Sequence, residues 1–108
     1  MIIVSYTAQG GRLRLSVAGH AGADEPGRDT VCASASILAY TVAHIVKNAW
    51  AANELCAKPV IKMKPGDAVI ECSPYKSAMK EIVYVYYAVF VGLSLLARDY
   101  PEYVKIVK

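Results

Sequence analysis

Two hairpin signals, each followed by a long apolar segment, constrain the fold of this chain more than any other feature. The first signal lies between residues 2–7 and 12–18, where Gly10-Gly11 supplies the backbone freedom that a tight turn requires. Within residues 12–18 apolar and polar side chains alternate strictly, which is typical of a strand with one buried face. These residues are therefore expected to form an antiparallel strand pair.

The second hairpin signal is Pro65-Gly66, which lies between strand-like residues 57–63 and 67–73. A long helix is expected after each hairpin, from Asp29 or Thr30 to about residue 52 and over residues 76–97, because apolar residues recur there at helical spacing. The chain thus shows the order strand, strand, helix in each half.

We predict one α+β domain over residues 1–108, in which a four-stranded antiparallel sheet from two hairpins carries two main helices (ββαββα). A short last helix is expected from Pro101, because proline suits the first turn of a helix.

The helix expected over residues 76–97 is apolar on two faces. One face, expected to pack on the sheet, consists of Met79, Val83, Tyr86, Phe90 and Leu93. The other consists of Tyr84, Tyr87, Val91 and Leu95. A domain of this size has too little core to bury both faces, so we predict a homodimer with this helix at or near the interface.

The composition narrows the classes of function. Hydrophobic residues make up 56% of the chain and charged residues 19%, and the net charge of +3 is scattered, so nucleic-acid binding is disfavoured. Three cysteines with no secretory leader before them favour reduced thiols in a cytoplasmic protein. Residues 82–97 carry no charge, but the run is shorter than the roughly 20 residues of a membrane span, and no membrane association is expected.

Cys32 is expected at the second or third position of the first helix. The first turn of a helix carries unpaired backbone N–H groups and the positive end of the helix dipole. Both stabilise a thiolate, the nucleophilic form of cysteine, and the N–H groups can also hold an oxyanion. By composition alone a single cysteine in an apolar helix is more often a packing residue.

His20 ends the second strand, and a loop rich in glycine connects it to Cys32. A strand end and a helix start joined in this way can lie close together, which makes His20 a candidate general base. Asp29 either caps the helix, the simpler role, or orients one of the two groups. A metal site of His20, Cys32 and an acid such as Asp24 is disfavoured, because no paired metal-ligand spacing is present.

A longer pattern runs through these residues: Gly19-His20-Ala21, Gly27, Asp29, Val31-Cys32-Ala33 and Ser36. It resembles the signature of the Prp family, bacterial cysteine proteases that remove an N-terminal extension from a large-subunit ribosomal protein. The segment over residues 100–104 is similar to the closing segment of that family, and the likeness in length and element order covers the whole chain.

The resemblance implies a catalytic dyad of His20 and Cys32, a protein substrate, a homodimer and no cofactor or metal. It also implies that the loop containing Gly22, Pro26 and Gly27 orders around the substrate and gates the site. Before that happens the two catalytic side chains are expected to stand apart.

Further residues of the motif, Gly19, Asp29, Ala33 and Ser36, are candidates for supporting the dyad or contacting the substrate. Ser36 lies one helical turn after Cys32 and shares its face, where it either contacts substrate or permits close packing. Residues 23–28 depart from the family pattern, because they are acidic and lack an aromatic side chain.

That departure leaves other functions open. A related protease that acts on a phage capsid protein would suit an altered loop. A non-enzymatic ribosome-assembly or RNA-binding module, supported only by the modest positive charge, and a structural dimer with a vestigial site are the remaining alternatives.

Overall fold

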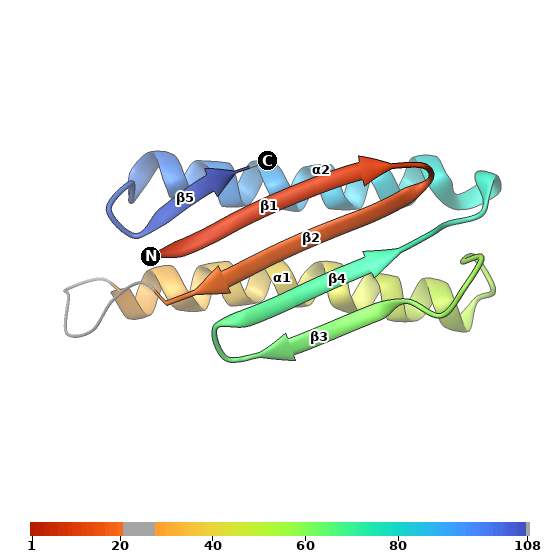
Figure 1. The fold of residues 1–108 in the computed structure, drawn as a ribbon, viewed down its shortest axis with the longest axis horizontal. Helices are drawn as coiled ribbons and strands as arrows, with labels where there is room; N and C mark the ends of the chain where they lie inside the picture. The colour runs from red at the N-terminus through yellow and green to blue at the C-terminus, as the bar shows by residue number, and fades with distance from the viewer. Residues whose placement is uncertain (21–27, 108) are drawn as a thin grey trace.

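The computed structural model describes residues 1–20 and 28–107, which form two layers: a five-stranded sheet with two long helices across one face (Figure 1). The elements follow the order β1 (Ile2–Gln9), β2 (Arg12–Gly19), α1 (Arg28–Ala51), β3 (Val60–Lys64), β4 (Asp67–Cys72), α2 (Lys76–Asp99) and β5 (Val104–Val107). The predicted α+β class and the strand, strand, helix order of both halves are confirmed.

The sheet differs from the prediction in having a fifth strand and a mixed arrangement. Its strand order is β3-β4-β2-β1-β5, and β5 pairs parallel with β1, with Val104 opposite Ile2. The four-stranded, fully antiparallel sheet was therefore wrong at this edge, and so was the short helix from Pro101. Val104 is buried and Lys105 is exposed, which is the period of a strand with one buried face.

A turn precedes β5 where the helix was expected. The backbone N–H groups of Tyr103 and Val104 both donate to the Tyr100 carbonyl, at 2.9 and 3.0 Å, and the chain then extends along β1. β1 offers this segment a sheet edge that β2 leaves unpaired, and pairing there satisfies the backbone groups of both strands. Pairing with β1 therefore determines the structure of this segment.

The core lies between the sheet and the helices. Leu13 and Leu15 of β2 are at most 2% exposed, which confirms the buried face predicted from the alternation. On α2, Tyr86 and Leu93 are buried, while Met79, Val83 and Phe90 pack partly against the core. The opposite face of α2, with Tyr84, Tyr87, Val91 and Leu95, is exposed as predicted.

Both helices are long and apolar enough, by length and composition alone, to cross a membrane: the mean hydropathy is 1.3 for Thr30–Ala51 and 1.5 for Lys76–Asp99. Core helices of soluble proteins meet the same test. Here each helix packs one face against the sheet, so composition alone gives weak evidence for a span.

A buried polar contact ties α2 to β4. The Tyr86 hydroxyl donates to the Ile70 carbonyl at 3.1 Å and to the Cys72 sulfur at 3.5 Å. Burial raises the pKa of the Cys72 thiol above the 9.0 of a free thiol. The hydrogen bond from Tyr86 lowers this pKa in part, and the neighbouring Glu71 carboxylate raises it. Burial also raises the pKa of the Tyr86 hydroxyl.

These shifts predict a loss of stability in alkali. A thiol whose pKa is raised in the folded state stays protonated to a higher pH in the folded protein than in the unfolded chain. Its contribution to the stability of the fold is therefore complete below about pH 9 and declines above it. In urea unfolding between pH 8 and pH 10, wild type should lose more stability than Cys72→Ala, by at most about 1.4 kcal/mol per pH unit. Cys56→Ala removes an exposed thiol and should follow wild type; identical alkaline losses in all three would contradict the prediction.

Candidate active site

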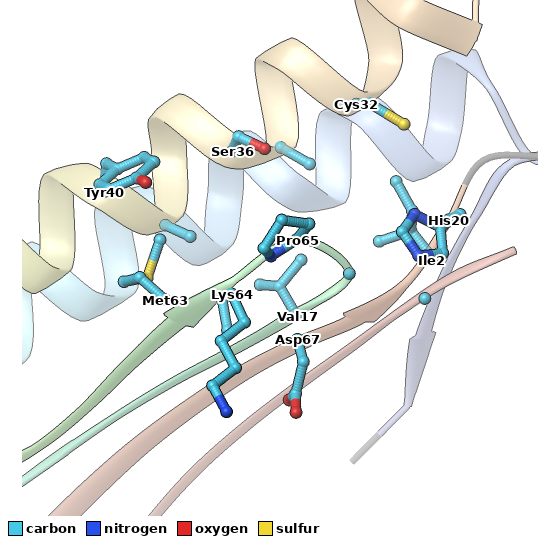
Figure 2. Close-up of a pocket in the computed structure, with 15 residues that line it drawn as sticks. Ile2, Val17, His20, Cys32, Ser36, Tyr40, Met63, Lys64, Pro65 and Asp67 are labelled. Carbon is cyan, nitrogen blue, oxygen red and sulfur yellow. The ribbon is translucent and has the colours of Figure 1, made fainter.

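A cavity of about 310 Å³ opens between α1 and the β3–β4 hairpin (Figure 2). One wall carries Cys32, Ser36 and Tyr40, which follow one another at single-turn spacing along one face of α1. The opposite wall includes Met63 and Pro65 of the hairpin. The volume lies at the lower end of the roughly 300–1,000 Å³ of small-ligand sites.

Small residues on the inner side of α1 keep this cavity open. Ala35 and Ala39 line it and are 3% and 1% exposed, and Ala68 lines it from β4. Larger side chains at these positions would close the gap between helix and hairpin. The interior is therefore mostly apolar, and an extended peptide could place an apolar side chain in it.

Cys32 lies further into its helix than the sequence predicted. Because α1 begins at Arg28, Cys32 is the fifth helical residue, and its own N–H lies beyond the unpaired first turn. Side chains of a helix tilt toward its N-terminus, so the thiol still lies beside that first turn. The residue is half-buried and lines the cavity, which leaves its sulfur accessible.

His20 follows β2 directly and lies at the same end of the cavity as Cys32 (Figure 2). Its backbone is held by the Met1 amino group, which donates to the His20 carbonyl. Next to it, the Gly19 N–H donates to the Gly66 carbonyl at 2.8 Å. Among the residues that the structure describes, no hydrogen bond joins the imidazole to the thiol.

The other residues singled out from the motif fare differently. Ser36 and Gly19 line the cavity, and Gly19 has a positive φ of 104°. A Cβ at Gly19 would overlap the carbonyl oxygen of Met1, so glycine is needed where β1 and β2 meet. Ala33 is exposed and does not belong to the cavity lining found among the described residues.

The predicted gate lies outside the described residues. Gly22, Pro26 and Gly27 fall in that part of the chain, as does the side chain of Asp29. Within residues 1–20 and 28–107, no group of three or more His, Cys, Asp or Glu side chains could hold a metal ion. The second histidine, His44, is exposed on α1.

The far wall of the cavity was not predicted from the sequence. Met63, Pro65 and Gly66 line it from the β3–β4 hairpin, and Tyr40 lines it from α1. Tyr40 could have been found from its spacing, since it lies two turns after Cys32 on the same face. The hairpin residues carry no local signal, because only the pairing of β4 with β2 brings them beside His20.

The chain is similar to one known protein family. A family model described as cysteine protease Prp matches residues 1–105. No curated protein matches the chain.

Solved structures share the fold. The SMU.848 protein of Streptococcus mutans is 24% identical, with a TM-score of 0.66 over 98% of this chain and 91% of that one. An essential ribosomal processing protease Prp from S. aureus, in complex with a substrate peptide, is 21% identical, with a TM-score of 0.68 over 99% and 98% of the two chains. The S. aureus Prp bound to a covalently linked product peptide is 20% identical, with a TM-score of 0.67 over 98% and 97%.

Proposed function

Because this chain belongs to the cysteine protease Prp family, we propose that it is a cysteine endopeptidase with Cys32 as its nucleophile and His20 as its general base. The observation that carries this assignment is the cavity that has both residues at one end. A substrate strand in that cavity would present its scissile carbonyl beside the thiol.

The proposed reaction proceeds in two stages. His20 takes the proton of the Cys32 thiol, and the sulfur attacks the scissile carbonyl to form a tetrahedral oxyanion. Backbone N–H groups at the start of α1 hold that oxyanion. The oxyanion collapses with cleavage of the C–N bond, and His20 returns the proton to the leaving amine. Water activated by His20 then hydrolyses the thioester and releases the new carboxylate.

We further propose that the substrate is the N-terminal extension of a large-subunit ribosomal protein, cut in the cytoplasm. The S. aureus relatives support this, because one is described as a ribosomal processing protease bound to a substrate peptide and another holds a covalently linked product peptide. No cofactor enters the proposed reaction.

The test is incubation of the protein with a large-subunit ribosomal protein that carries its N-terminal extension. Mass spectrometry should find the shortened protein and the released peptide. If a phage capsid protein is cleaved instead, the proposed protease activity stands and the proposed ribosomal substrate is wrong. If neither is cut, and an RNA is bound with an affinity that falls steeply with salt, the enzymatic function is wrong.

The exposed face of α2 supports the proposed homodimer. Tyr84, Tyr87, Val91 and Leu95 are 38–64% exposed and lie in one stripe at helical spacing. The same apolar stripe on a second copy of the chain would let the two stripes cover each other, as in an interface between identical subunits. We propose that the two copies pack α2 against α2.

Replacing the two tyrosines of this stripe should separate the subunits. Tyr84→Asp with Tyr87→Asp places two charges of each subunit in the proposed interface, so size-exclusion with light scattering should give the mass of a monomer, against a dimer for wild type. Tyr75→Ser removes an exposed tyrosine outside α2 and should leave the dimer intact. A monomeric wild type at micromolar concentration would overturn the proposed homodimer.

A further inference from the structure

Gly66 occupies a special position in the turn between β3 and β4. Lys64 pairs with Asp67, so Pro65 and Gly66 form the two central residues of the hairpin turn. Gly66 has a φ of +72°, which proline followed by glycine provides in a type II turn. This conformation alone accounts for glycine in the turn, as it does for Gly10 in the β1–β2 turn, where φ is +59°.

Gly66 differs from Gly10 in what lies next to it. A Cβ added at Gly66 would overlap Nε2 of His20 and would lie 2.6 Å from Cε1 and 3.2 Å from Cδ2 of the same ring. A Cβ added at Gly10 would meet nothing within 4 Å. The imidazole of His20 therefore packs with its Nε2–Cε1 edge closest to Gly66, in space that only glycine leaves free.

The surroundings make this contact important for the ring. His20 is exposed and lies just beyond the last residue of β2, so the strand itself does little to restrict its rotamers. The hydrogen bond from the Gly19 N–H to the Gly66 carbonyl fixes the two backbones side by side. The turn thus provides a rigid surface behind an otherwise loosely held imidazole.

We propose that Gly66 is a positioning residue, which sets the imidazole of His20 at the Cys32 end of the cavity by leaving room for the ring against the β3–β4 turn. This inference rests on the proposed role of His20 as general base. A displacement of about 1 Å at a catalytic group can cost roughly 10²-fold in rate. Any side chain at residue 66 would impose a displacement of that order.

The test compares Gly66→Ala with Gly10→Ala. Both substitutions place a Cβ at a positive φ in a hairpin turn, but only the first collides with His20. We expect kcat for peptide cleavage to fall at least about tenfold in Gly66→Ala relative to Gly10→Ala, with a much smaller change in KM, because the proton-transfer group is displaced and the peptide site is retained. Equal kcat values in the two variants would overturn the proposal.

Two further measurements do not depend on proteolysis. The Cε1 proton resonance of His20 should shift in Gly66→Ala and stay in place in Gly10→Ala. The melting temperature should fall more in Gly66→Ala than in Gly10→Ala, and the difference should vanish when both are made in a His20→Ala background. An unmoved resonance, or a difference that survives without the imidazole, would contradict the contact.

The design separates this inference from the proposed function. If wild type cleaves no substrate, the function fails, while resonance and melting still decide whether Gly66 places the ring. If Gly66→Ala does not fold, Gly66→Asn replaces it, because asparagine tolerates the left-handed region while still introducing a Cβ. If wild type is active and Gly66→Asn is fully active, the proposed protease function stands and the proposed positioning role of Gly66 is wrong.

Discussion

Replacing Cys32 with alanine should reduce cleavage of the extended ribosomal protein by about 10³-fold or more. The sulfur is the atom that forms the bond to the scissile carbonyl, and the methyl group of alanine cannot form that bond. The substitution removes a half-buried thiol that lines a cavity, so the fold should be retained. Initial rates of peptide release, with circular dichroism for folding, measure both outcomes.

The chain offers a matched control for this experiment. Cys56 is a free, exposed cysteine that does not line the cavity, and Cys56→Ala should cleave at the wild-type rate. Cys32→Ser keeps the shape of the side chain but supplies a much weaker nucleophile, and should be nearly as inactive as Cys32→Ala. Cleavage by Cys32→Ala at the wild-type rate would remove the cysteine-protease assignment of this residue.

Much of the fold follows from local signals. Gly10-Gly11 and Pro65-Gly66 both close hairpins as predicted, and both lie where a positive φ is required. The alternation in β2 identified its buried face, because alternate residues of a strand point to opposite faces and only one of those faces is apolar here. The two helices were long enough for their spacing to be read without ambiguity.

The predictions of secondary structure were wrong where contacts with distant segments of the chain determine the local structure. The fifth strand was missed because four residues carry little periodicity and because Pro101 favours a helix start by local rules. Only the parallel pairing of β5 with β1, more than 90 residues away in the chain, makes it a strand. A tertiary contact overrides a weak local preference here.

The same distinction applies to the site. Cys32 was found from a helix start and His20 from the motif, and the structure brings both to one cavity. The position of Cys32 within α1 was wrong, because the helix begins at Arg28 rather than at Asp29 or Thr30. The wall formed by Pro65 and Gly66 could not be predicted, since it depends on how the second hairpin pairs with the first.

His20→Ala should lower the cleavage rate by about 10²–10⁴-fold, the usual contribution of a general base. The imidazole is needed twice in the proposed reaction, to take the thiol proton and to protonate the leaving amine. The loss should appear chiefly in kcat, because His20 is exposed at one end of the cavity while the apolar lining that would hold the peptide is unchanged.

His44→Ala is the matched control, because His44 is the other histidine, is exposed on α1 and does not line the cavity. It should cleave at the wild-type rate and keep the wild-type dependence of rate on pH. If His20→Ala retains the wild-type rate, another group moves the proton, and the position of His20 against Gly66 serves the fold rather than the reaction.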